Sequence, residues 1–212
     1  MRFERKYKID HLSKSAVEQA VKLHAAGFQK IYPNRQVNNI YFDTPDYQTG
    51  RHNIEGVNQR KKFRLRWYGP DVQKIDAPRL EIKIKENELG RKEIFAFQDN
   101  QLDNLAEITE AANIQFSKYQ YSHLQPTLLN TYQRSYWGTS CGKFRITVDW
   151  KLVYYTPMLK HTFFQTPIHQ KSVILELKYD EAMDIRGKEI FKGLPFRQTK
   201  SSKYVMGILL NH

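Results

Sequence analysis

The chain has 212 residues, and its 34 lysines and arginines against 22 aspartates and glutamates leave a formal net charge of +12. Hydrophobic residues make up 40% of the chain, which is enough for a closed core and excludes intrinsic disorder as the main state. Apolar runs such as 205–210 are far shorter than the roughly 18 to 20 residues that cross a bilayer. The charged start at 2–6 is unlike a secretory signal, and the single Cys141 excludes an internal disulfide.

These features predict one cytoplasmic domain over residues 1–212 with no membrane span. The basic charge predicts a polyanionic partner, which could be nucleic acid, an anionic membrane surface or a phosphate-rich small molecule. Net charge alone does not choose among these partners. The positions of the charges along the chain are more informative.

Stretches rich in β-branched and aromatic residues predict eight strands, at 2–9, 36–43, 60–69, 79–86, 91–98, 127–138, 143–156 and 171–179. Helical spacing predicts helices at 13–26, 99–112, 181–192 and 199–211. Proline, glycine and aspartate predict turns at 44–46 and 68–71. Long antiparallel strands with a few helices indicate an α+β fold.

Six of the predicted strands alternate an apolar face with a face of almost exclusively charged residues. In the strand at 60–69, for example, Lys62, Arg64 and Arg66 alternate with aromatic and aliphatic residues. The charged faces of the six strands hold Arg2, Glu4, Lys6, Lys8, Lys62, Arg64, Arg66, Glu81, Lys83, Lys85, Arg134, Arg145, Asp149, Lys151, Glu176 and Lys178.

An ordinary sheet with one face in water would explain any single strand of this kind. Solvent-facing strand positions usually mix Thr, Ser, Gln and Asn with charges, however, and these faces do not. The alternative is a sheet closed into a barrel, with its apolar faces outward under helices and its charged faces lining a tunnel. So many bases in one lumen repel each other, and a bound polyanion would relieve that repulsion.

Several motifs follow one another in an order that matches a known family. They are 3–7 (FERKY), 40–44 (IYFDT), 63–69 (FRLRWYG), 80–83 (LEIK), 131–134 (TYQR), 175–178 (LELK) and 200–204 (KSSKY). With these motifs the chain resembles the VTC domain, the polyphosphate polymerase domain of the vacuolar transporter chaperone complex. That domain belongs to the triphosphate tunnel metalloenzymes, the CYTH-like superfamily. The resemblance covers nearly the whole chain.

The resemblance implies a closed antiparallel eight-stranded β tunnel with a charged lumen, flanked by helices and ending in a C-terminal helix. It implies transfer of the terminal phosphoryl group of ATP or another nucleoside triphosphate to a growing polyphosphate chain, with Mn²⁺ or Mg²⁺ as cofactor. The residues carried over as catalytic are Arg64, Arg66, Lys83, Arg134 and Lys200. Those carried over as substrate-binding are Lys6, Lys85, Tyr132, Lys178, Ser202 and Lys203. Glu176 is carried over as the metal ligand.

Residue chemistry suits these roles, because arginine forks and mobile lysines can follow repeating phosphates, and a hard divalent cation prefers carboxylate oxygen. Glu4 and Glu81 are further candidates for metal ligands, while Asp149 is interpreted as a charge balancer. Lys200 and Lys203 would share one face of the last predicted helix. Lys85 departs from the eukaryotic members, which carry a histidine there.

Two other functions stay open at this point. The first is hydrolysis of inorganic triphosphate or a similar substrate, since the same tunnel would serve water as the attacking group. The second is a binding module for polyphosphate or nucleic acid, suggested by the basic run at 60–66. No RNA-binding signature is present, so nucleic acid is not the expected partner. Eukaryotic members carry a regulatory SPX domain and membrane helices, so regulatory or export partners would come from elsewhere.

Overall fold

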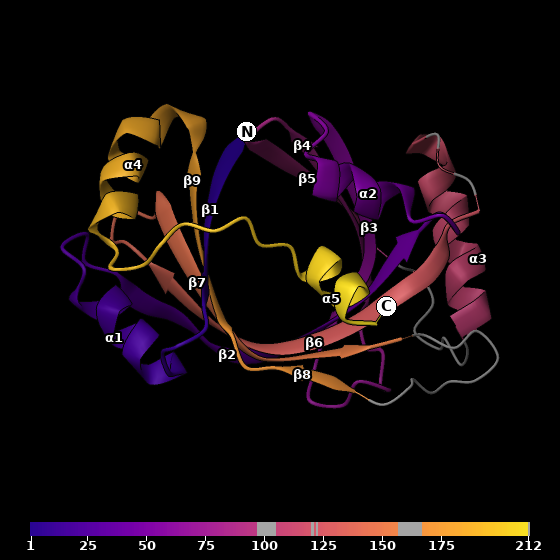
Figure 1. Cartoon of the computed structure of the whole chain (residues 1–212), viewed down its shortest axis with the longest axis horizontal. Helices are drawn as coiled ribbons and strands as arrows, with labels where there is room; N and C mark the ends of the chain where they lie inside the picture. Colours follow the sequence, from indigo (N-terminus) through magenta and orange to yellow (C-terminus); the bar gives the residue numbers. More distant parts are fainter. Residues whose placement is uncertain (97–104, 120, 122, 157–166, 212) are drawn as a thin grey trace.

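Eight antiparallel strands close into a ring. The computed structural model describes residues 1–96, 105–119, 121, 123–156 and 167–211. Neighbouring strands follow the order β6-β2-β3-β4-β5-β1-β9-β7, and β7 pairs back with β6, while the short β8 adds to the outer edge of β7. The strands are β1 (Arg2–Ile9), β2 (Gln29–Asp43), β3 (Gln59–Tyr68), β4 (Arg79–Glu86), β5 (Leu89–Ala96), β6 (Gln125–Gly138), β7 (Phe144–Tyr155), β8 (Ile168–Gln170) and β9 (Val173–Asp180). This ring confirms the expected α+β tunnel (Figure 1).

The helices are α1 (Lys14–Leu23), α2 (Gln48–Glu55), α3 (Leu105–Phe116), α4 (Asp184–Gly193) and α5 (Lys203–Asn211), with short 3-10 turns at Ser117–Tyr119 and Glu181–Met183. α1, α3 and α4 lie outside the ring, while α5 lies within its curve and contacts α2 (Figure 1). α1 begins where Ser13 caps it, because the Ser13 hydroxyl accepts a hydrogen bond from the Ala16 amide at 3.2 Å. In the described part of the chain no helix has both the length and the apolar character needed to cross a membrane.

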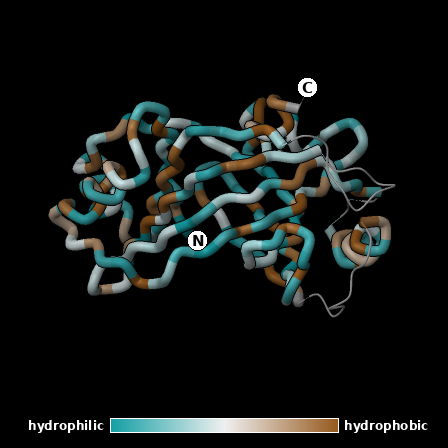
Figure 2. Tube along the Cα trace, turned by 90° about the horizontal axis from the view of Figure 1, so that it is seen from below, coloured by the Kyte–Doolittle hydropathy of each residue, from teal (hydrophilic) through white to brown (hydrophobic). Residues whose placement is uncertain are grey.

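The outer faces of the strands are apolar and are covered by helices, as the alternation predicts. One cluster packs Val17 and Val21 of α1 and Ile190 of α4 against β1, β7 and β9. A second cluster packs α3 against the outer faces of β3 and β4. Hydrophilic and hydrophobic residues alternate along neighbouring strands in Figure 2. The charged residues opposite these apolar positions therefore face the lumen.

Several boundaries differ from the expected ones. β2 begins at Gln29, before the expected start at residue 36. Its first half is exposed and mostly polar and shows no alternation, so the sequence pattern did not predict it. The helix expected at 99–112 spans Leu105–Phe116, and residues 97–104 lie outside the described part, as do 97–98 of the strand expected at 91–98. α2 and β8 were not expected, since both are short and mostly polar.

A bulge in β7 also changes the expected face of one residue. Lys151 has a φ of +52°, and the pairing of β6 with β7 shifts register there. Lys151 is exposed, while Asp149 before it and Leu152 after it are buried. The expectation that Lys151 continues the charged face is therefore wrong, because the inserted residue reverses the alternation that follows it.

α5 makes part of the lumen apolar. The helix begins at Lys203, so the expected start at 199 was wrong, and Lys200 precedes the helix. Tyr204 packs in a buried cluster with inward-facing residues of β2, β6, β7 and β9. Gly207 permits this close approach, since a Cβ there would lie 2.3 Å from Leu128 Cδ2. The lumen is therefore charged along one part and filled by α5 along another.

Candidate functional site

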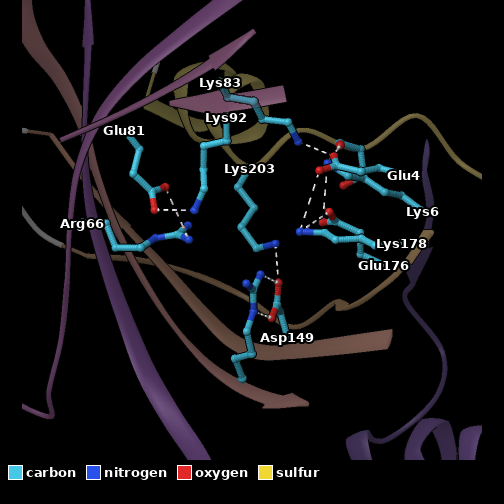
Figure 3. Close-up of polar contacts among 12 residues, drawn as sticks. Glu4, Lys6, Arg66, Glu81, Lys83, Lys92, Asp149, Glu176, Lys178 and Lys203 are labelled. Atoms are coloured by element: carbon cyan, nitrogen blue, oxygen red, sulfur yellow. Dashed lines mark hydrogen bonds and ion pairs between the residues drawn. The ribbon is translucent and has the colours of Figure 1, made fainter. Parts of the chain in front are cut away.

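The lumen holds two carboxylates that neighbouring strands β1 and β9 bring together. Antiparallel pairing places Lys6 opposite Glu176 and Glu4 opposite Lys178. Lys178 Nζ lies 3.0 Å from Glu176 Oε1 and 3.8 Å from Glu4 Oε1, and Lys6 Nζ lies 3.8 Å from Glu176 Oε2. Lys83 of β4 reaches across to pair with Glu4. Figure 3 shows these groups converging on one side of the lumen.

Opposing effects set the ionisation of this carboxylate pair. Burial raises the pKa of Glu4, and the like charge of Glu176 raises it further, but Lys83, Lys178 and Lys6 outweigh both and lower the pKa to about 2. Burial also raises the pKa of Glu176, yet the same lysines hold it well below its usual value. Both carboxylates are therefore ionised at neutral pH.

The arginines of β3 meet a different carboxylate. Glu81 lies opposite Arg64 in the pairing of β3 with β4. Its Oε2 accepts from Arg64 Nε at 2.7 Å and lies 3.6 Å from Arg66 Nη1, and its Oε1 accepts from Lys92 Nζ at 2.8 Å. Arg66 Nε also donates to Asn39 Oδ1 at 2.8 Å. Figure 3 shows Glu81 with Arg66 and Lys92 on the other side of the lumen from Glu4 and Glu176.

A third cluster joins β6 and β7 to the start of α5. Asp149 is fully buried. Its carboxylate accepts from Arg134 Nε and Nη2 at 2.6 and 2.8 Å and from Lys203 Nζ at 2.6 Å. Arg134 and Lys203 also lie over the ring of Tyr132, at 5.2 and 4.7 Å from its centroid. These contacts agree with the interpretation of Asp149 as a charge balancer.

The phenol of Tyr132 lies among cations. Burial raises its pKa, but Arg134 and Arg66 lower it more strongly, to about 8. Arg66 Nη2 donates to the Tyr132 hydroxyl at 3.3 Å. Tyr132 therefore links the cluster around Glu81 to the cluster around Asp149.

Lys62 lies between these clusters and has no carboxylate partner among the described residues. Burial and the like charges of Lys6 and Lys83 hold its pKa well below the usual value of a lysine. Its Nζ donates to Ser202 Oγ at 2.8 Å, and the same hydroxyl accepts from the Val205 amide at 3.3 Å in the first turn of α5. A bound anion beside this amine would favour its charged form.

Two expected site residues lie away from these clusters. Lys200 is exposed and belongs to the segment before α5, so it does not share a helix face with Lys203. That segment follows the edge of β1, where the Thr199 amide donates to the Lys6 carbonyl at 3.0 Å. Lys85 lies further along the lumen opposite Arg60, and its pKa is lowered by burial and then by Arg60.

Sequence reasoning missed several residues that the ring brings to the lumen. These are Lys62 as a site residue, Lys92 and the polar group Asn39, Tyr41 and Asn130. Asn39 Nδ2 donates to Asn130 Oδ1 at 2.8 Å, while Asn130 Nδ2 is buried without a hydrogen-bond partner in the described part. Asn39 and Tyr41 occupy alternate positions of their strand, so they could have been assigned to one face. The other face also contains a polar residue, Asn38, so the sequence did not show which face points into the lumen.

Carboxylate chemistry limits what metal site the chain could form. Glu4 and Glu176 lie close enough to share Lys178 as an ion-pair partner, whereas Glu81 is held by three cations elsewhere. Among the described residues, no three His, Cys, Asp or Glu side chains gather as a metal site. Two ionised carboxylates fit a hard divalent cation that takes its remaining ligands from substrate oxygens and water.

A closed antiparallel ring with a cationic lumen defines a protein of the triphosphate tunnel class. The family model of the VTC domain matches residues 1–212, and the chain belongs to that family. The identification from sequence motifs is thereby confirmed.

Solved structures share this fold at low sequence identity. A protein from Vibrio parahaemolyticus described as a putative adenylate cyclase has a TM-score of 0.56 and 16% identity, over 96% of this chain and 97% of that one. The putative adenylyl cyclase HpAC1 from Hippeastrum, described as revealing a dominant triphosphatase activity, has a TM-score of 0.53 and 17% identity, over 100% of this chain and 96% of that one. No curated protein matches the chain.

Proposed function

We propose that this protein is a metal-dependent polyphosphate polymerase that transfers the terminal phosphoryl group of a nucleoside triphosphate to a polyphosphate chain. The observation that carries this proposal is the row of bases on β3. Arg66, Arg64, Lys62 and Arg60 occupy alternate positions of one strand, so the row extends over about 20 Å at about 3.4 Å per residue. A row of that length suits a phosphate chain longer than a triphosphate.

Each group in the lumen has a role in this reaction. An oxygen of the polyphosphate end attacks the γ-phosphorus, a new P–O bond forms, and the bond to the β-phosphate breaks with its electron pair leaving on the nucleoside diphosphate. Arg64, Arg66 and Arg134 would bind phosphate oxygens through their guanidinium N–H donors. Lys62 and Lys83 neutralise charge that the transferring group carries.

Glu176, with Glu4 beside it, would hold the divalent cation. The cation would supply neutralisation of phosphate charge and a fixed position for the phosphate oxygens. The buried Asn130 Nδ2, which has no partner in the described part, would provide a further donor to a phosphate oxygen. Charged ligands of both signs in one lumen therefore suit a metal–phosphate complex.

The protonation states of the lumen carboxylates favour a phosphate oxygen as the attacking group. The end of a phosphate chain is already ionised at neutral pH and needs no base to remove a proton. The lumen carboxylates Glu4, Glu81, Asp149 and Glu176 all have a lowered pKa, and this makes them weak bases.

Hydrolysis of triphosphate is the second candidate, and the lysines favour it. Burial lowers the pKa of Lys83 to about 8, and that of Lys62 is also well below the usual value. A neutral amine at either position could accept a proton from an attacking water. The similarity to the Hippeastrum protein described with triphosphatase activity is compatible with this candidate.

One incubation separates these functions. We would incubate the protein with ATP and Mn²⁺ or Mg²⁺, resolve polyphosphate on a gel, and assay free phosphate in the same tube. Chains that require the metal and disappear in Glu176→Gln, but persist in the exposed control Glu189→Gln, would support the polymerase. Free phosphate without chains would support the triphosphatase. Tight polyphosphate binding with neither product would indicate a binding module.

A further inference from the structure

One end of the lumen carries an arginine among three tyrosines. The guanidinium carbon of Arg35 lies 5.6 Å from the ring centroid of Tyr32 and 5.9 Å from those of Tyr68 and Tyr136. The rings of Tyr32 and Tyr136 meet edge to face, with centroids 5.8 Å apart. Among the described residues, no carboxylate forms an ion pair with Arg35. We call these four residues the mouth cluster.

The mouth cluster continues the lumen outward from its arginines. Tyr68 follows Arg66 by two residues on β3, and Tyr136 follows Arg134 by two residues on β6, so each tyrosine shares the face of its arginine. Strand pairing places Arg35 opposite Arg134. Exposure rises along this path, from 6% at Arg66 to 37% at Tyr68.

The chemistry of the mouth cluster differs from that of the deeper lumen. The deeper groups are bases and carboxylates, which suit phosphate and metal. Aromatic faces add little to the binding of a phosphate, but they stack on nucleobases, as does the plane of an arginine. Tyr32, Tyr68 and Arg35 are exposed, so a ligand can reach the cluster from solvent.

We infer that the mouth cluster binds the nucleoside of a nucleoside triphosphate by stacking on its base, while the triphosphate extends inward past Arg66 and Arg134. This inference rests on the proposed function, because it assigns the nucleotide end of the same lumen. The growing chain would then occupy the opposite end, toward Arg60. Stacking reads no base edges, so purines should bind more tightly than pyrimidines without strict selection of one base.

The test compares ATP with methyl triphosphate, which keeps a triphosphate ester and lacks the nucleoside. Both are titrated calorimetrically into the wild type and into Arg35→Ala, Tyr68→Ala, Tyr136→Ala and Tyr136→Phe. Arg186→Ala, an exposed arginine on α4, is the matched control. Arg35 and Tyr68 are exposed, so their variants keep the test available if Tyr136→Ala does not fold.

We expect the wild type to bind ATP about 5- to 150-fold more tightly than methyl triphosphate. The alanine variants should lose most of that difference in affinity and keep their affinity for methyl triphosphate. Tyr136→Phe and the control should retain the difference between the two ligands. Equal losses for both ligands would overturn the nucleoside site, because the cluster would then act on phosphate alone. No loss in any variant would overturn it too.

Failure of the proposed function gives a different result. A wild type that binds ATP more tightly than methyl triphosphate but forms no polyphosphate contradicts the polymerase and keeps the nucleoside site. A wild type that forms polyphosphate but binds both ligands equally contradicts the nucleoside site and keeps the polymerase.

Discussion

The hydroxyl of Tyr204 on α5 donates a hydrogen bond to Asp43 Oδ2 at the end of β2, at 2.5 Å. Asp43 is fully buried and also accepts from the amides of Thr49 and Gly50, at 2.9 and 2.8 Å, in the first turn of α2. One carboxylate therefore joins a strand end to two helices. Because Lys203 precedes Tyr204, this contact also fixes the lysine that faces Asp149.

Loss of the Tyr204 hydroxyl should destabilise the protein. Tyr204→Phe removes a donor from a buried carboxylate, and a hydrogen bond to a charged group contributes about 1.5–3 kcal/mol to the free energy of unfolding. Urea denaturation measures this loss. Tyr32→Phe, which removes an exposed hydroxyl, should change the free energy of unfolding by less than about 0.5 kcal/mol. Equal stability of the two variants would contradict the role given to the Asp43 contact.

Removal of lumen bases should affect the stability of the ligand-free protein in opposite directions. Repulsion alone predicts that loss of any base is stabilising, including Arg64. The structure changes that expectation, because Glu81 is buried and both Nε and Nη2 of Arg64 contact its Oε2. Arg64→Met should therefore lower the free energy of unfolding by about 1–3 kcal/mol.

Lys62→Met should instead raise the free energy of unfolding, by about 1 kcal/mol, since it removes an amine whose charged form is disfavoured by burial and by the like charges of Lys6 and Lys83. Urea denaturation of both variants without ligand measures the contrast. Polyphosphate affinity should fall in both. A Lys62→Met protein less stable than the wild type would show that its contact with Ser202 outweighs the repulsion.

Stability should fall in acid because of Glu4. Its pKa is about 2 in the folded protein, against an ordinary value of 4.5 for a glutamate. The unfolded chain therefore takes up the proton first, and the stabilisation is present above pH 4.5 and is lost as the pH falls toward 2. This lowering of the pKa corresponds to about 3 kcal/mol of the free energy of unfolding. The free energy of unfolding, measured across this pH range, should change less with pH in Glu4→Gln than in the wild type. In Glu55→Gln, on the exposed end of α2, it should follow the wild type.

Binding of triphosphate should take up protons in mildly alkaline buffer. Burial lowers the pKa of Lys83 to about 8 from the ordinary lysine value of 10.5, so its ammonium is largely deprotonated above that pH in the free protein. A polyanion beside it favours the charged form and raises the pKa. Calorimetry in two buffers of different ionisation enthalpy measures the uptake. Lys83→Met should reduce it, and an unchanged uptake would assign the protons to other groups.

Without ligand, the same lysine should make stability rise with pH. Between about pH 8 and 10.5 the unfolded chain binds more protons at this position than the folded protein does, and stability increases where that holds. In Lys83→Met this contribution to the rise of the free energy of unfolding with pH should be absent.

Local pattern was sufficient to predict most strands and the direction of their faces. The alternation in β3 and β4 predicted which side chains lie inward, because successive strand residues point to opposite faces. It failed at Lys151, where an inserted residue reverses the order, and at Gln29–Arg35, where no alternation exists. The motif at 200–204 identified a functional segment but did not show that the helix begins only at Lys203.

The sequence by itself determined the closed sheet, its charged inner face and the membership of the VTC domain family, since all three follow from period-two alternation and from ordered motifs. Tertiary structure alone decided which charges meet. It pairs Glu81 with the β3 arginines, brings Glu4 and Glu176 to the same lysine, Lys178, and leaves Lys62 without a carboxylate among the described residues. Those contacts depend on strand register and on where α5 enters the ring, and both are set by pairing between residues far apart in the chain.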